Sequence, residues 1–442
     1  MTYENIKSVI LVFLVCFSVL LTWSIWMYQP NYEMMKKQNT VEKVAISEKK
    51  EVGEIIKPDR IYYHLSKEKH YGTVDKNEIK KIITEIGRWN FTDFENISDE
   101  IKNPYSFSHS PGNTVIVFPD SIPIDLYRSI IDIKDKDLPN FQFDQIVIDV
   151  EGVQKEQSFV YFISTKNEKA YRSHVPSSFV SNFNTSFFKN VEYTINYVKY
   201  FPYKSSNERI FFLPEKETKM LSYQYLSNPL DSEKYKNALF IDPSVVQKNY
   251  LLSGEEYKDY SSLMRVNYDK NTLSYINPVE SSESHFPSNN LLKRSIDFVN
   301  EHGGWTGKYR FVEVDELNHR VLFRLYEDKG YPVFSDENGI SEIRHKWGQN
   351  EILEYSRSNF SFGVLTETVE KTLSSGHEVL EWLESMEDFD LDLVQDIVLG
   401  YTMTKDPQTP LVYLEPSWYY QYNHSWYKIS MDEFEGGNHG LE

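Results

Sequence analysis

The hydropathy pattern begins with one long apolar run that carries no charged residue, at positions 9–27, which reads VILVFLVCFSVLLTWSIWM. As a helix that rises about 1.5 Å per residue, this run would span the roughly 30 Å hydrocarbon core of a bilayer. The pattern predicts a transmembrane helix over residues 9–28. A short tail (1–8) precedes it, and a polar, Lys/Glu-rich stalk (29–56) follows it.

The residues that end the apolar run favour an uncleaved anchor over a signal peptide. Trp23, Trp26 and Tyr28 are expected as interfacial anchors, because amphipathic rings settle at the membrane–water boundary. A signal peptide would end in a small-x-small cleavage site, which is missing here. The short tail and the large C-terminal body favour a single-pass protein of the cell membrane with a cytoplasmic N-terminus, although the flanking charges are nearly balanced.

Capping residues followed by apolar residues at helical spacing predict the main helices of the body. Asp75 caps the first one, with Glu78 three residues on, and Gly87 ends it. Ser375 and Glu378 form a capping box at the start of a later helix. Other helices are expected at 124–131, at about 243–251 after the Asp242-Pro243 pair, and from Leu291 to Val299 before Gly303-Gly304.

Short runs rich in β-branched and aromatic residues predict many strands. They are expected at 114–118, 143–150, 159–164, 170–175, 209–213, 219–226, 411–414, 418–422 and 426–429. Hairpins are expected for 263–268 with 273–276 and for 309–314 with 320–326. Strand runs interrupted by isolated helices predict an α+β fold with antiparallel sheets.

Breaks in this pattern divide the body into three predicted extracytoplasmic α+β domains. Their bounds are 57–204, 205–287 and 288–434, and a flexible tail is expected at 435–442. The second and third blocks share a helix-then-hairpin order, which is a weak internal repeat in order and not in residue identity.

Composition excludes several classes of function. The chain has 442 residues and a net charge of −19, which argues against nucleic-acid binding because that needs a cationic surface. Its only cysteine, Cys16, lies in the predicted membrane helix. The body therefore has no disulfide, no thiol nucleophile and no thiolate metal site, which favours a bacterial cell surface.

A search for catalytic and metal motifs finds none that is complete. Nucleotide-binding loops and the hydrolase nucleophile elbow are missing, and His377-Glu378 lacks the second histidine of a zinc protease helix. Asp388, Asp390 and Asp392 have the opening spacing of a calcium loop, but Leu393 stands where glycine is needed. We therefore predict no catalytic residue, no metal and no cofactor.

Two further patterns have a structural and a functional reading. One is an acidic helix face, made of Glu378, Glu381, Glu384 and Glu387. A solvent-exposed face is the favoured interpretation, and paired catalytic carboxylates are the alternative. The aromatic segment 418–427 could form a ligand platform, but a hairpin whose rings fill the core is the favoured reading.

Several segments of the chain resemble the YycH family of Gram-positive bacteria. These segments are ENIKS at 4–8, WMYQPNY at 26–32, FP at 118–119, SIP at 121–123, DLPN at 137–140 and FDQIVID at 143–149. The similarity in length and order extends over nearly the whole chain, and it is weakest in the C-terminal third.

The resemblance implies a regulator and not an enzyme. Proteins of this family are single-pass membrane proteins with three extracytoplasmic α+β domains. They act with the similarly built YycI protein on the sensor histidine kinase WalK (YycG), whose response regulator controls cell-wall metabolism genes. Contact is thought to involve the membrane helices, and the sign of regulation differs between relatives.

Ser18 and Thr22 lie one helical turn apart, and we predict them as a possible transmembrane helix contact. The alternative is that both hydroxyl groups bond back to their own helix. Two other classes of protein also remain open, an anchored extracellular ligand-binding module and an anchored cell-wall hydrolase.

Overall fold

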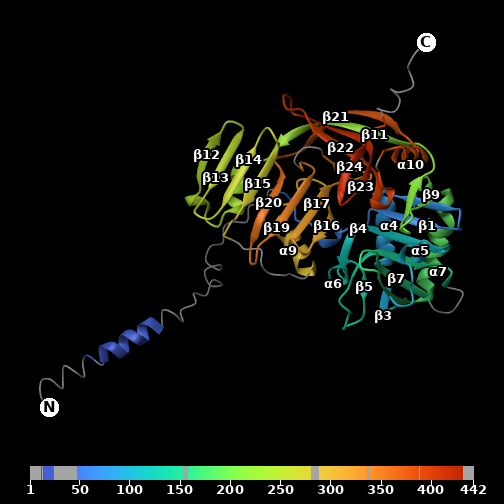
Figure 1. The fold of residues 1–442 in the computed structure, drawn as a ribbon, viewed down its shortest axis with the longest axis horizontal. Coiled ribbons are helices and arrows are strands. Elements are labelled where there is room, and N and C mark those ends of the chain that lie inside the picture. Colours follow the sequence, from blue (N-terminus) through green and yellow to red (C-terminus); the bar gives the residue numbers. More distant parts are fainter. Residues whose placement is uncertain are drawn as a thin grey trace, which may run out of the picture. The chain divides into compact units, whose positions relative to one another are not determined.

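The computed structural model describes residues 11, 13–23, 47–152, 158–279, 288–335, 339–387 and 389–431. The chain divides into two compact units, Met1–Lys43 and Val44–Glu442. The first contains a helical segment, made of residues 11 and 13–23, and the second contains three sheets with their helices (Figure 1).

A ten-stranded sheet is built from the N-terminal half of the body. Its order is β10-β9-β2-β1-β4-β6-β7-β8-β3-β5, and all pairs are antiparallel except β3 with β5. The strands are β1 (Arg60–His64), β2 (His70–Thr73), β3 (Asn90–Asn96), β4 (Asn113–Pro123), β5 (Asp132–Ile133), β6 (Gln142–Asp149), β7 (Ser158–Ser164), β8 (Lys169–Val175), β9 (Val198–Lys204) and β10 (Ile210–Pro214). The helices here are α3 (Val52–Ile55), α4 (Lys76–Ile86), α5 (Pro104–Ser108), α6 (Ile124–Tyr127), α7 (Ser177–Ser186) and the 3-10 helix η2 (Phe188–Tyr193).

Alternation along β1 places buried side chains on both faces of this sheet. Tyr63 packs on Phe183 of α7 on one face, and Tyr62 packs on Phe212 of β10 on the other. Both tyrosine side chains are at most 5 % exposed. Both faces of the sheet therefore carry buried side chains.

An eight-stranded antiparallel sheet consists of two four-stranded halves, each preceded by a helix. Its order is β12-β13-β14-β15-β20-β19-β17-β16, so the last strands of the two halves, β15 and β20, pair in the middle. The first half has α8 (Ser232–Leu239), the 3-10 helix η3 (Pro243–Val245), β12 (Gln247–Leu251), β13 (Gly254–Lys258), β14 (Leu263–Asn267) and β15 (Thr272–Ile276). The second half has α9 (Ser288–Glu301), β16 (Tyr309–Asp315), β17 (Arg320–Leu325), β19 (Glu342–Trp347) and β20 (Ile352–Ser358).

A six-stranded sheet completes the body. Its order is β18-β22-β23-β11-β21, with β24 paired to β23. The elements are β11 (Thr218–Pro229), β18 (Val333–Phe334), β21 (Phe360–Leu373), α10 (Gly376–Glu384), the 3-10 helix η4 (Leu391–Leu393), β22 (Val394–Lys405), β23 (Leu411–Tyr422) and β24 (Ser425–Ile429).

Local signals predicted four of the described α-helices, namely α4, α6, α9 and α10, and missed α3, α5, α7 and α8. Asp75 caps α4 by accepting bonds from two backbone N–H groups, and Ser375 with Glu378 forms the predicted capping box of α10. The helix predicted at 124–131 is shorter, because α6 ends at Tyr127. The helix predicted at 243–251 is wrong, since only a 3-10 turn follows Asp242 and the rest is strand β12, whose backbone pairs with β13.

The α+β class with large antiparallel sheets is confirmed, and the strands run across the predicted boundaries. Strand β9 pairs with β10 across 204/205, and β15 pairs with β20 across 287/288. The division into three domains stays a prediction. The tail at 1–8, the end of the body at 432–434 and the tail at 435–442 lie outside the described residues.

No helix among residues 11–23 and 47–431, gaps excepted, is long and apolar enough to cross a membrane. The transmembrane helix over 9–28 stays a prediction, because residues 9, 10, 12 and 24–28 lie outside the described ones. The same holds for the stalk residues 29–46.

Candidate functional site

The predicted contact residues Ser18 and Thr22 lie on the first unit's helical segment, with exposed side chains. The Thr22 hydroxyl donates a 2.9 Å hydrogen bond to the Ser18 carbonyl oxygen, one turn earlier on the same helix. Trp23 is 61 % exposed, whereas Trp26 and Tyr28 lie outside the described residues. The side chains around them, such as Phe13 and Phe17, are also exposed and apolar. Whether this face meets another helix stays a prediction.

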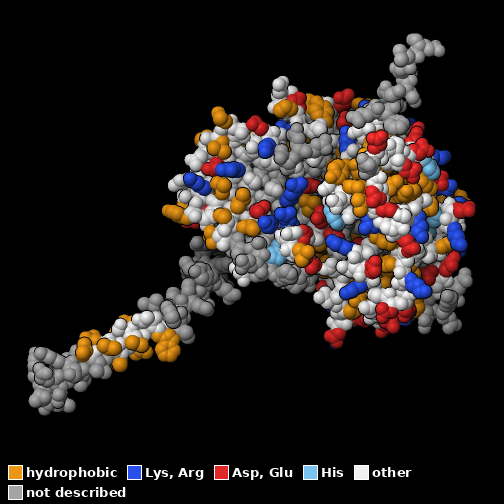
Figure 2. All heavy atoms as spheres, viewed as in Figure 1, with side chains coloured by type: hydrophobic (Ala, Val, Ile, Leu, Met, Phe, Trp, Pro, Cys, Tyr) orange, Lys and Arg blue, Asp and Glu red, His pale blue; other side chains and the backbone are white. Residues whose placement is uncertain are grey.

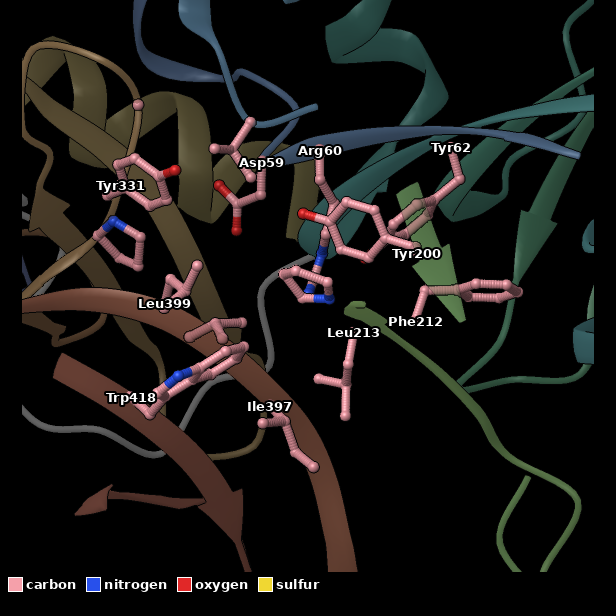
Figure 3. Close-up of a pocket in the computed structure, with 15 residues that line it drawn as sticks. Asp59, Arg60, Tyr62, Tyr200, Phe212, Leu213, Tyr331, Ile397, Leu399 and Trp418 are labelled. Carbon is pink, nitrogen blue, oxygen red and sulfur yellow. The ribbon is translucent and has the colours of Figure 1, made fainter. Parts of the chain in front are cut away.

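A polar junction joins the ten-stranded sheet to the six-stranded sheet within the body (Figure 3). The Arg60 guanidinium, at the start of β1, forms an ion pair with the Asp396 carboxylate of β22. These two side chains are 15 % and 26 % exposed, so most of the pair is shielded from water. Removal of one partner alone would leave a largely buried charge without compensation, which is destabilising.

Asp59 extends this junction to the eight-stranded sheet. Its carboxylate accepts a 2.7 Å hydrogen bond from the Tyr326 hydroxyl, 267 positions away in sequence. Burial raises the pKa of Asp59, while Arg60 and the Tyr326 hydroxyl act in the opposite direction. Arg310 stacks over the Tyr326 ring at 4.3 Å. All three sheets therefore meet around one partly ionic network.

The cavity at this junction is too small for an organic ligand. Its volume is about 40 Å³, and Tyr62, Tyr200, Leu399 and Trp418 are among the side chains that line it (Figure 3). A water molecule needs roughly 10–15 Å³ of such volume, so the cavity has room for about three waters. Sites for drug-sized molecules have volumes of about 300 Å³ or more. The geometry fits a structural junction.

Three histidines form a hydrogen-bonded chain next to the junction, where Phe212 contacts the His64 ring. The ring nitrogens are 2.9 Å apart between His109 Nδ1 and His64 Nε2, and 2.8 Å apart between His64 Nδ1 and His70 Nδ1. His70 Nε2 lies 3.1 Å from the Lys67 carbonyl oxygen. A carbonyl only accepts, so His70 donates from Nε2, and the other two rings then donate from Nδ1.

This tautomer pattern satisfies every bond of the chain with all three rings neutral. Burial lowers the pKa of His64 and His70, and it lowers the pKa of His109 to about 3. Both nitrogens of His64 are used by different neighbours, so the rings do not converge on one point as metal ligands would. The three histidines therefore form a neutral hydrogen-bond network.

An open hollow of about 400 Å³ lies beside strands β7 and β8 of the ten-stranded sheet. Ile97, Phe107 and Tyr161 contribute its apolar lining, and Arg172 lies at its rim. Arg172 donates to Glu95 at 2.7 Å, and a Glu100 carboxylate lies 3.6 Å away. The hollow has the size of a ligand site, although its one described arginine is already engaged by carboxylates.

The other sequence-predicted acidic and aromatic groups have structural roles. Asp390 caps η4, and Asp392 accepts a 3.0 Å bond from the Ser206 backbone N–H, while Asp388 lies outside the described residues. Trp418 and Tyr419 are buried in the core, as the structural reading of the aromatic segment expects. Within the ranges that the structure describes, no group of three or more His, Cys, Asp or Glu side chains could hold a metal ion.

Sequence reasoning missed both the Arg60–Asp396 pair and the histidine chain. The ion pair joins residues 336 positions apart, and no local pattern marks either partner. His64 and His70 flank a short hairpin in register, so their spacing of six could have suggested a contact. His109 reaches them from the C-terminal cap of α5, which only the packing reveals.

Comparisons with known proteins place this fold and sequence in a family. The family model for the N-terminal domain of the YycH protein matches residues 4–192, and the model for its C-terminal domain matches residues 208–436. The two-component system WalR/WalK regulatory protein YycH of Bacillus subtilis (strain 168) is 26 % identical over 463 residues and is covered fully, as is this chain. The crystal structure of YycH from Bacillus subtilis has a TM-score of 0.74 at 24 % identity, covering 88 % of this chain and 100 % of that one, and so shows the same fold.

Proposed function

Since the chain belongs to the YycH family, we propose that it is a membrane-anchored extracytoplasmic regulator of a WalK (YycG)-type sensor histidine kinase. The observation that supports this most directly is the full-length similarity to a regulatory protein of a WalR/WalK two-component system. A YycI-type protein is the second proposed partner. The resemblance of the N-terminal segments to the family supports an anchor over residues 9–28.

The mechanism follows from differential binding. A kinase with two signalling states changes its output only if a partner binds one state more tightly than the other. Anchoring both proteins in one membrane raises their effective concentration, so weak contacts become sufficient. The exposed apolar helix at residues 13–23 and the surfaces of the body are the two places where such contacts can form.

The test separates these two contributions. Three chains are compared in cells that lack the native gene: the full chain, residues 1–32 alone, and residues 33–442 behind an unrelated membrane helix. The readout is the phosphorylated fraction of the response regulator. We expect the full chain to change this fraction, and one of the two partial chains to retain part of the effect. If the full chain leaves the fraction unchanged, the proposal is wrong.

A ligand-binding module is the second candidate, and the 400 Å³ hollow beside Tyr161 is the observation that favours it. Ile101 also lines this hollow. This function predicts that filling the hollow by Ile101→Trp abolishes a response to an extracellular ligand while the kinase complex persists. An anchored hydrolase is supported less well. Glu378, the first acid of the α10 face, accepts its bonds from Ser375 in the helix cap.

A further inference from the structure

The eight-stranded sheet has β12 at one edge and β16 at the other. The two edge strands differ in how far they are buried. Strand β16 closes one side, and its Val314 backbone N–H donates a 3.0 Å bond to Asp120 of β4. Most of β16 is buried. Strand β12 closes the other side, four of its five residues are exposed, and no described strand pairs with its outer edge (Figure 1).

Exposed apolar side chains concentrate at this uncovered end. Among the described residues of the body, eighteen large hydrophobic side chains are exposed, and nine of them lie within residues 241–279. Tyr250 is 78 % exposed, and Leu252, in the turn after β12, is fully exposed. Figure 2 shows apolar side chains scattered over this end of the molecule. An excess of exposed apolar side chains at one end of a protein is compatible with an interaction surface there.

The register of the β12–β13 hairpin shows which backbone groups are free. Leu251 and Gly254 pair directly across a two-residue turn, so they exchange both backbone hydrogen bonds. Because bonded and non-bonded pairs alternate, Lys248 and Tyr250 turn their N–H and C=O groups away from β13. These groups face outward along the edge and can be satisfied by one more strand.

The edge of β12 also lacks a free charged side chain that would prevent another strand from pairing with it. Natural edges are often protected by lysine, and β12 has Lys248. Its ammonium group, however, lies 3.2 Å from the Glu233 carboxylate and 3.0 Å from that of Glu255. By contrast, the free edge strand β21 displays the exposed charges of Glu367, Glu370 and Lys371.

We propose that the outer edge of β12 pairs antiparallel with β12 of a second copy of this chain, about a two-fold axis at Asn249. This register pairs all five residues of the strand. It places Lys248 opposite the second copy's Tyr250, and Gln247 opposite its Leu251. No like charges face each other, and the lysine gains an aromatic neighbour of the kind it already has at 5.1 Å within its own chain.

Shifted registers fit less well, so pairing between two copies has one favoured register. An axis at Lys248 would place two lysines opposite each other, which is destabilising. An axis at Tyr250 would leave Gln247 beyond the paired strand. The two eight-stranded sheets would then continue as one across the axis, with the free backbone groups of both edges satisfied.

Disulfide cross-linking of the full chain in detergent micelles tests this register, because Cys16 is the only native thiol. In a Cys16→Ser background, Asn249→Cys should form a cross-linked dimer under mild oxidation, since the Cα atoms of facing residues are about 4.5–5.5 Å apart. The matched control is Gln247→Cys, whose two copies would be about 13 Å apart along the strands. Gln247→Cys combined with Leu251→Cys should cross-link again.

Sedimentation of the uncross-linked chain supplies the second readout. Tyr250→Lys would face Lys248 of the second copy, and should raise the dimer dissociation constant at least tenfold, whereas Tyr250→Phe should leave it unchanged. A monomeric full chain, equal cross-linking of the 247 and 249 variants, or cross-linking of residue 249 to a different protein in membranes would each overturn the proposal.

Discussion

Arg60 and Asp396 form a mostly buried ion pair that joins the first strand of one sheet to a strand of another, across 336 positions of sequence. One residue earlier, Asp59 accepts a hydrogen bond from Tyr326, which directly follows β17 of the eight-stranded sheet. The consecutive side chains of Asp59 and Arg60, at the start of β1, therefore connect segments that belong to or adjoin three sheets. These contacts lie within the single compact unit that contains the described part of the body.

The first prediction concerns this pair. Asp396→Asn leaves the Arg60 charge without its partner, and should lower the free energy of unfolding by about 2–4 kcal/mol. Arg60→Met combined with Asp396→Leu should recover most of that loss. The control is Glu370→Gln, which removes an exposed pair with Lys219 and should cost less than about 1 kcal/mol. Urea unfolding measures all three, and equal losses for the 396 and 370 variants would contradict the assignment.

The second prediction concerns the histidine chain. His64 and His70 are nearly fully buried, and the pKa of each is lower in the fold than in the unfolded chain. The unfolded chain therefore binds more protons below about pH 6.5, and stability falls as the pH drops through that value. At pH 5.5 a histidine that stays fully neutral in the fold would account for a loss of at most about 1.4 kcal/mol.

His109→Gln tests this mechanism, because a glutamine amide can still donate to His64 but takes up no proton. The difference in unfolding free energy between pH 8 and pH 5.5 should shrink by about 1 kcal/mol in this variant. An unchanged difference would show that His109 is already protonated in the fold. Replacement of the partly exposed His174, which is not part of the histidine chain, serves as the control.

The third prediction concerns Asp144, for which the free energy of unfolding changes with pH in the opposite direction. Asp144 is buried, and its carboxylate accepts two 2.9 Å bonds from Thr165, yet burial raises its pKa to about 7. The folded state therefore keeps a proton that the unfolded state loses near pH 4, and stability falls as the pH rises from about 4 to 7. Asp144→Asn should stabilise the protein by roughly 2–4 kcal/mol at pH 8. At pH 4 the variant and the parent should melt at similar temperatures, which is the internal control.

The fourth prediction concerns Ser18 and Thr22. Replacement of both by leucine removes the Thr22 bond to the Ser18 carbonyl and blocks close approach of another helix on that face. Co-purification with the kinase should weaken several-fold. Cys16→Leu with Leu20→Ile alters the opposite helix face, about 160–200° away, and should leave the association unchanged. If both variants bind equally, the hydroxyl face is not the contact.

The sequence by itself determined the elements whose signals are local. Asp75 and Ser375 mark helix starts because a cap needs only residues two or three positions away. The hairpin of β14 and β15 was equally predictable, since Asn271 adopts the left-handed conformation that its tight turn requires. The bond between Thr22 and Ser18, one turn apart, is likewise an outcome that spacing alone allows.

Only the tertiary structure decided the features that depend on distant segments. Residues 247–251 became strand β12 and not a helix, because pairing with β13 outweighed the local cap at Asp242. Strands β19 to β22 also escaped prediction, and one of them, β21, pairs with the distant strand β11. Arg60 and Asp396, like the three histidines, meet only after the sheets have packed. A charge or an imidazole acquires its role from the burial and the partner that packing supplies, and neither is written in the nearby sequence.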